Sequence, residues 1–92
     1  MTPPPARAPD AAAAPAPALT IDALGKKCPI PIIMLAERIG EVPTGQIIEV
    51  LADDPATTTD VPAWCGLKSH EFVRAIGLPG DSGWAFLVRR CY

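Results

Sequence analysis

A sharp change in composition near residue 18 constrains what this chain can fold into. Of the first 18 residues, eight are alanine and six are proline, whereas the other six prolines are spread over residues 19–92. A segment with almost no large apolar side chain cannot offset the entropy lost on ordering, so we expect residues 1–18 to be a disordered Ala/Pro-rich tail. One domain of 74 residues, 19–92, remains. This size excludes a large enzyme with its own deep substrate cavity.

The charge and cysteine content limit the partners and the compartment. The formal net charge is −2, and the basic residues form no run that could neutralise several phosphates, so we expect no direct nucleic-acid binding. We find no signal-peptide pattern and no apolar run of about 18 residues, so we expect no membrane span. Three cysteines without close spacing are not typical of a secreted disulfide scaffold. We therefore predict a cytoplasmic protein with reduced thiols.

Hydrophobic periodicity predicts four strands and two helices. Alternating or β-branched apolar residues predict strands over residues 19–24, 46–52, 70–76 and 84–91. Two helical segments separate the first three strands, which gives the order β-α-β-α-β-β. Two crossover helices followed by a hairpin favour a two-layer α/β sandwich, with a four-stranded mixed sheet and both helices on one face.

Prolines and glycines mark the ends of the two predicted helices. The first helix begins with Pro29 and ends at Gly40, the asymmetry expected of helix starts and stops. The second helix has Asp54 as its N-cap and Pro55 as its first residue. We expect it to end by Gly66.

Cys28 lies where the first strand passes into the first helix. A thiol there meets unpaired backbone amides and the positive end of the helix dipole, which favour the thiolate, and Lys26 and Lys27 add positive charge. Pro29 and Pro31 stiffen the backbone around the sulfur. Such a thiolate is suited to attacking another sulfur or carrying a group, but helix starts also carry inert, buried cysteines.

The residues around Cys28 resemble a known signature. Residues 24–31, Leu-Gly-Lys-Lys-Cys-Pro-Ile-Pro, are similar to the Cys-Pro-x-Pro signature of the TusA family of sulfur-carrier proteins, also called the SirA-like family. Residues 53–65 resemble the family's second helix, and residues 70–71 and 86–90 resemble its last two strands. The resemblance spans essentially the whole of residues 19–90.

The resemblance implies a carrier that takes sulfane sulfur as a persulfide on Cys28, without a metal or organic cofactor. The implied donor is a pyridoxal-phosphate cysteine desulfurase or a rhodanese-type sulfurtransferase. The implied acceptor is a protein of tRNA thiolation, molybdenum-cofactor assembly or sulfur oxidation. Lys26 and Lys27 are candidates for steadying the anionic sulfur, although each taken singly is better explained as a solvated lysine. Ile30 stands where tRNA-thiolating members carry glutamate, so the donor and acceptor stay open.

Several alternatives remain at this point. A non-catalytic interaction or RNA-binding module of the same fold is the alternative function. Cys65 is either a resolving thiol or, as we favour, a buried packing residue, and Cys91 is expected to be exposed without a role. His70 is expected to be a strand-start residue with a satisfied hydrogen bond, and the spacings of Cys28, Cys65, Cys91 and His70 do not suit zinc. We expect a monomeric carrier rather than a stand-alone turnover enzyme.

Overall fold

The computed structural model describes residues 16–92, so the predicted tail, residues 1–18, lies almost wholly outside the described part. The elements follow in the order β1 (Leu19–Asp22), α2 (Ile30–Arg38), η2 (Ile39–Glu41), β2 (Ile47–Ala52), α3 (Thr57–Lys68), β3 (Glu71–Gly77), η3 (Pro79–Asp81) and β4 (Trp84–Arg89). The elements η2 and η3 are single 3-10 turns. Without these turns, the order is the predicted β-α-β-α-β-β.

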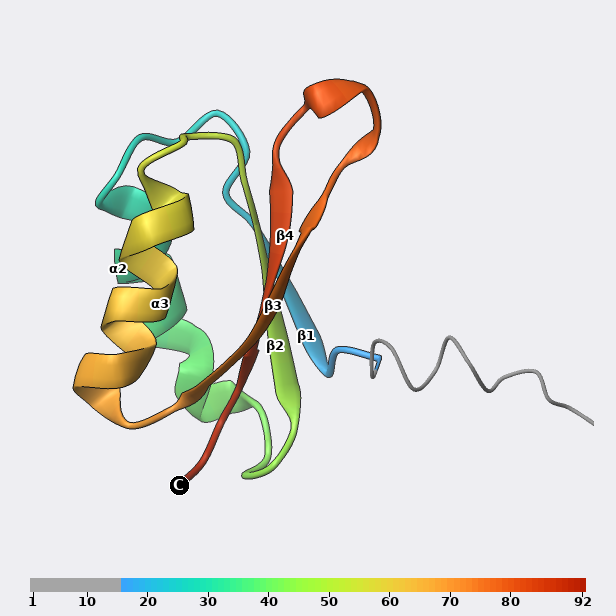
Figure 1. The fold of residues 1–92 in the computed structure, drawn as a ribbon. Helices are drawn as coiled ribbons and strands as arrows, with labels where there is room; N and C mark the ends of the chain where they lie inside the picture. The colour runs from blue at the N-terminus through green and yellow to red at the C-terminus, as the bar shows by residue number, and fades with distance from the viewer. Residues whose placement is uncertain (1–15) are drawn as a thin grey trace, which may run out of the picture.

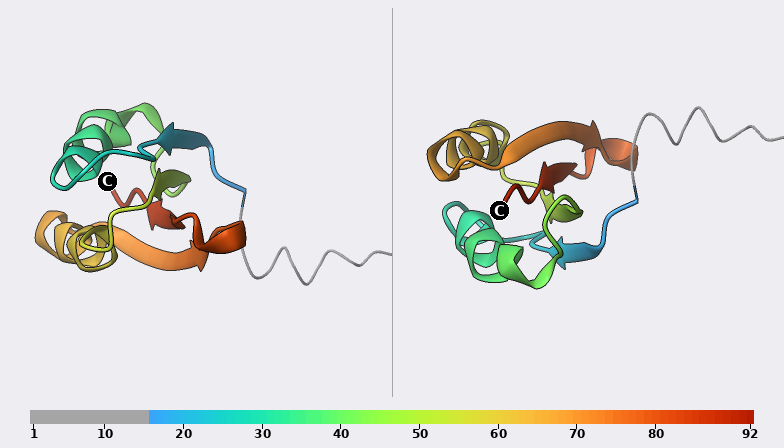
Figure 2. Two further views of the ribbon diagram at one scale, coloured as in Figure 1. Left: turned by 90° about the horizontal axis from the view of Figure 1, so that it is seen from above. Right: turned by 90° about the horizontal axis from the view of Figure 1, so that it is seen from below.

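The four strands form one mixed sheet in the order β1-β2-β4-β3. β1 pairs with β2 in parallel, and β4 pairs antiparallel with both β2 and β3. Both helices pack side by side on one face of this sheet (Figures 1 and 2). The predicted two-layer α/β sandwich is therefore confirmed.

The core lies between the helices and the sheet. On the central strands β2 and β4, alternate side chains point toward the helices, as the period of two along a strand requires. The largest fully buried side chains of this layer include Ile21, Leu35, Ile48, Val50, Val61, Phe86 and Val88. Within residues 16–92 there is no helix long and apolar enough to cross a bilayer.

The second helix differs from its prediction at both ends. α3 begins at Thr57, and Asp54 and Pro55 lie in the turn before it. It continues past Gly66 to Lys68 and is closed by Ser69, whose φ of 63° is left-handed. The prediction that glycine ends this helix was therefore wrong, because the serine takes the left-handed position that glycine usually occupies.

The other boundaries shift by at most two residues. α2 begins at Ile30, with Pro29 as its N-cap and Pro31 in its first turn. The first and last strands end earlier than predicted, at Asp22 and Arg89. Edge strands and helix ends fray, so shifts of this size leave the architecture unchanged.

The loop between β3 and β4 is fastened to the end of β2 at Gly83. This residue has a φ of 133°, and a Cβ atom there would lie 2.6 Å from the carbonyl oxygen of Ala52. Only glycine permits so close an approach of two backbones. The contact fixes the chain directly before Asp53, where the loop to α3 begins.

Candidate functional site

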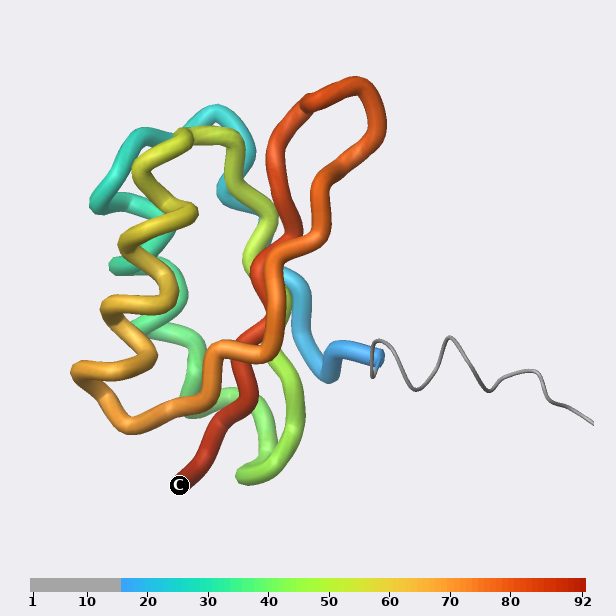
Figure 3. The backbone as a smooth tube through the Cα atoms, viewed as in Figure 1, coloured from blue at the N-terminus to red at the C-terminus, as the bar shows by residue number. Residues whose placement is uncertain are grey.

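Two loops meet at the edge of the sheet where the parallel strands β1 and β2 end. Each loop leads into the N-terminus of a helix, and the two lie side by side above the helices (Figure 3). Cys28 is half-buried in the first loop, and its peptide bond to Pro29 is cis. The backbone N–H of Cys28 donates a hydrogen bond of 2.9 Å to Oδ2 of Asp54, in the second loop. The cysteine is therefore held from across the sheet edge.

Asp53 and Asp54 join the two loops through backbone hydrogen bonds. Oδ1 of Asp54 accepts from the N–H of Ala56 at 3.0 Å, while Oδ2 accepts from Cys28. Both carboxylate oxygens of Asp53 lie 3.1 Å from the N–H of Gly25. The bonds from Cys28 and then Ala56 hold the pKa of the Asp54 carboxyl below its usual range. The carboxylate of Asp54 thus fixes the backbone on both sides of the site.

The first residue of α3 faces the sulfur. Oγ1 of Thr57 lies 3.4 Å from Sγ of Cys28, which is within hydrogen-bond distance for sulfur. The Thr57 side chain is fully buried, and it is the one polar residue in the buried core of residues 16–92. A buried hydroxyl is costly without a partner, so this contact orients the thiol and satisfies the threonine together.

The surroundings of Cys28 favour its protonated form. Burial raises the pKa of the Cys28 thiol, and the hydrogen bond from Thr57 opposes this rise. The carboxylate of Asp60 raises the pKa of the thiol further, as does the charge of Asp54. The direction of this shift runs against the expectation that the helix dipole and the lysines favour a thiolate, because burial and the two carboxylates favour the thiol.

The four predicted supporting residues all lie in the loop or the first turn of α2. Lys26 and Lys27 are exposed, and the charge of Lys27 helps to lower the pKa of Asp54. Pro29 is exposed beside the thiol, while Pro31 is buried beneath the first turn of the helix. The prolines thus flank a fixed backbone, and the lysines face solvent.

The other two thiols lie away from Cys28. All three cysteines are free. Cys65 comes eight residues after Thr57 on α3, so it lies about 12 Å further along the helix at about 1.5 Å per residue. It is 2% exposed, and burial raises the pKa of its thiol to about 11. Cys65 is thus a packing residue rather than a resolving thiol, and Cys91 is exposed, as we expected.

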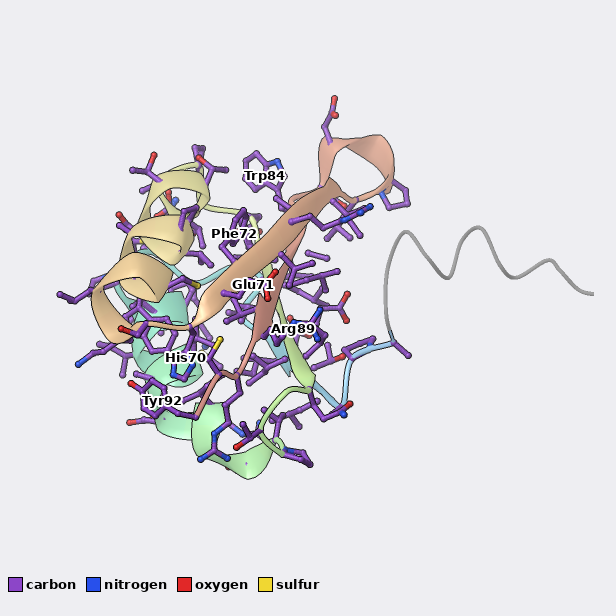
Figure 4. The ribbon with its side chains drawn as sticks, turned by 60° about the horizontal axis from the view of Figure 1, so that its bottom comes forward. His70, Glu71, Phe72, Trp84, Arg89 and Tyr92 are labelled. Atoms are coloured by element: carbon purple, nitrogen blue, oxygen red, sulfur yellow. The ribbon has the colours of Figure 1, made fainter. Side chains whose placement is uncertain are left out.

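His70 belongs to the opposite end of α3. Its ring stacks between those of Trp64 and Tyr92, at centroid distances of 5.5 and 4.7 Å, and Figure 4 shows it beside Tyr92. Nδ1 accepts a hydrogen bond of 3.1 Å from the N–H of Cys91. The prediction of a satisfied histidine is confirmed. Among residues 16–92, no group of three or more metal-binding side chains is close enough to hold an ion.

The basic residues near the C-terminus serve local structure. Arg89 pairs with Glu71 at 2.9 Å on the sheet face away from the helices (Figure 4). Arg90 points to the other side, where it donates to the carbonyls of Gly40 and Val42 at 3.1 and 2.7 Å. Neighbouring strand residues face opposite sides, so these arginines do not form one patch.

The sequence interpretation missed Thr57 and Asp60 as partners of the thiol. Both follow the predicted N-cap Asp54, and they lie three residues apart, so one face of α3 presents them together. Parallel pairing of the first two strands places both loops at one edge of the sheet. The sequence therefore contained the residues that contact the thiol, but they could be recognised only once β1 and β2 were known to be neighbours in the sheet.

Comparison with known proteins agrees with this geometry. The fold matches the crystal structure of a SirA-like protein from Desulfitobacterium hafniense with a TM-score of 0.69 and 21% sequence identity. The match covers 80% of this chain and 99% of that one. Residues 19–90 match the family model described as Sulfurtransferase TusA. The chain therefore belongs to the TusA sulfurtransferase family, whose members carry sulfur between donor and acceptor proteins.

Proposed function

We propose that Cys28 accepts a sulfane sulfur as a persulfide and relays it to an acceptor protein. The supporting observation is the position of its sulfur, half-buried between two helix starts and 3.4 Å from the hydroxyl of Thr57. Residues 19–92 form the carrier domain, with residues 1–18 as its tail. The protein acts in the cytoplasm as a monomer and needs no cofactor of its own.

Sulfur transfer to Cys28 is a displacement at sulfur. The Cys28 sulfur attacks the outer sulfur of the donor's persulfide, one S–S bond forms, and the donor's own S–S bond breaks. The thiol proton passes to the carboxylate of Asp60, which favours the protonated thiol, and from there to the departing donor thiolate. The donor's persulfide thus becomes a thiol and the Cys28 thiol becomes a persulfide, so the step needs no added oxidant or reductant.

The protonated resting state protects the free carrier. A raised pKa leaves little thiolate at neutral pH, so the unloaded Cys28 reacts slowly with stray electrophiles. A persulfide is more acidic than a thiol. The loaded carrier is therefore anionic and ready for transfer where the unloaded one is not.

The remaining site residues support the sulfur. Pro29 and Pro31 fix the backbone on the helix side of Cys28, and Asp54 fixes it from across the sheet edge. Lys26 and Lys27 supply positive charge to the anionic persulfide from the exposed loop. The donor is a cysteine desulfurase or a rhodanese-type sulfurtransferase, and the acceptor belongs to tRNA thiolation, molybdenum-cofactor assembly or sulfur oxidation.

Mass spectrometry tests the proposal directly. The reduced protein is incubated with inorganic polysulfide, or with a cysteine desulfurase and cysteine, and its intact mass is measured. We expect a gain of about 32 Da, the mass of one sulfur atom, which dithiothreitol removes. Fragmentation should locate the added sulfur on Cys28.

Matched cysteine variants separate the three thiols. Cys28→Ser should gain no sulfur from the desulfurase, whereas Cys65→Ser and Cys91→Ser should load like the wild type. Cys91 is the sharper control because it is exposed. Sulfur on Cys91 alone, or no adduct on a folded and reduced protein, would disprove the proposed role of Cys28.

A further inference from the structure

Large apolar side chains are exposed around Cys28. Leu24, Ile30 and Ile33 are 38%, 42% and 46% exposed, and we call these three residues the apolar rim. Six large apolar side chains of residues 16–92 are exposed to this degree, and half of them lie within five residues of Cys28. Single exposed apolar residues are ordinary, but a cluster beside a reactive group indicates a surface that another molecule covers.

The residues of the apolar rim lie on both sides of Cys28 in the sequence. Leu24 lies in the loop between β1 and α2, four residues before Cys28. Ile30 and Ile33 are three residues apart on α2, so they share a face of the helix. The buried face of that helix is formed by Pro31 and Leu35. The rim is therefore not part of the core, and the fold has no need of its apolar character.

The charges beside the rim are asymmetric. Lys26 and Lys27 are exposed in the same loop, and neither side chain donates a hydrogen bond within residues 16–92. The nearby carboxylates of Asp53 and Asp54 accept backbone N–H groups instead. The lysine side chains are thus exposed to a partner, whereas the two carboxylates already accept hydrogen bonds from the backbone of this chain.

Sulfur transfer requires that a partner cover the rim. An S–S bond is about 2.05 Å long, so the donor's sulfur must reach bonding distance of a half-buried Sγ. At that distance, the protein that carries the donor sulfur contacts the residues on either side of Cys28. Removing the apolar rim from water on contact with the partner favours such a complex.

We propose that the apolar rim, flanked by Lys26 and Lys27, is the docking surface for the sulfur donor. The donor is a protein whose sulfur-bearing cysteine lies in an apolar face bordered by carboxylates. The apolar contact holds the complex together, and the lysines steer the approach. This inference rests on the proposed function of Cys28.

The test compares a protein donor with a small one. The protein donor is a rhodanese-type sulfurtransferase loaded with thiosulfate, and the small donor is inorganic polysulfide. Ile30→Glu and Ile33→Glu should slow transfer from rhodanese by about tenfold or more and leave loading by polysulfide within about twofold. The double variant Ile30→Ser, Ile33→Ser removes apolar area without adding charge and should show the same split.

Leu67→Glu is the matched control. Leu67 is 77% exposed on the last turn of α3, away from Cys28, so this variant should accept sulfur from both donors at the wild-type rate. Wild-type rates from rhodanese in the rim variants, or equal slowing by Leu67→Glu, would overturn the docking surface alone. A wild-type protein that polysulfide does not load would instead overturn the proposed function.

Discussion

The hydroxyl of Thr57 lies 3.4 Å from the thiol of Cys28, across 29 positions of sequence. The threonine is fully buried, so its hydroxyl has a fixed position rather than a choice of rotamers in solvent. The reactivity of the sulfur is therefore set by the start of a helix to which it does not belong.

Replacing Thr57 by valine should make Cys28 less reactive. The threonine hydrogen bond lowers the pKa of the thiol, so its loss raises the pKa and reduces the thiolate present at neutral pH. We expect alkylation by iodoacetamide at pH 7 to slow several-fold, with the pH profile displaced upward. Thr57→Ser should retain the wild-type profile. Thr59→Val, at an exposed position of the same helix, should leave the rate unchanged.

Asp60→Asn should act in the opposite direction. The Asp60 carboxylate raises the pKa of Cys28, so a neutral amide lowers that pKa and increases the thiolate fraction at pH 7. Alkylation should therefore be faster than in the wild type, although the variant loses the group that takes up the thiol proton. Asp81→Asn, in the loop between β3 and β4, is the charge-matched control. Slower alkylation of Asp60→Asn would contradict the assigned role of this carboxylate.

Asp54→Ala should destabilise the protein in a manner that depends on pH. The hydrogen bonds from Cys28 and Ala56 lower the pKa of Asp54 in the folded state. Its stabilising effect is therefore complete above the unfolded-state pKa of about 3.9 and is lost as the pH falls through the folded-state value. Urea unfolding should show a deficit relative to the wild type at pH 7 that shrinks in strongly acidic buffer. An equal deficit at both pH values would argue against the carboxylate as the cause.

Cys65 should make the protein sensitive to alkali. Burial raises the pKa of its thiol from an ordinary 9.0 to about 11, so the unfolded chain loses this proton first as the pH rises. The stabilisation is present below pH 9 and is lost between pH 9 and 11. At about 1.4 kcal/mol per pKa unit, the loss of stability amounts to about 3 kcal/mol.

Urea unfolding of Cys65→Ala measures this effect. The variant starts from a lower stability at neutral pH, because it leaves a small cavity, but its stability should fall less between pH 9 and 11. Cys91→Ala should keep most of the wild-type pH dependence, since burial rather than Cys91 is the larger cause of the raised pKa. Identical alkaline slopes in the wild type and Cys65→Ala would refute the assignment.

Much of the architecture follows from the sequence. Alternation and β-branching predict the four strands, and the order of elements predicts two helices on one face, because parallel crossovers follow one hand. The same local logic misplaces the end of α3. Gly66 is an ordinary helical position, and the chain leaves the helix at Ser69 instead.

The surroundings of the thiol are harder to predict than the thiol itself. Cys28 is identified from its neighbours in sequence, and the nearest charges in sequence are Lys26 and Lys27. Burial raises its pKa most, and the side chains that act on it next, Thr57 and Asp60, both belong to α3. Long lysine side chains turn toward solvent, whereas short threonine and aspartate side chains are fixed by the helix that carries them. Neighbours in sequence therefore predict the wrong sign for the pKa shift.

The parallel pairing of β1 and β2 makes the state of Cys28 a property of the folded protein alone. When these strands separate, Asp54 and Thr57 leave the cysteine, and its sulfur returns to the pKa of a thiol in an open chain. An unfolded or newly synthesised copy would thus be more easily alkylated or oxidised than a finished one. The rate of thiol labelling would count how often this edge of the sheet opens, so the cysteine serves as a built-in reporter of local unfolding.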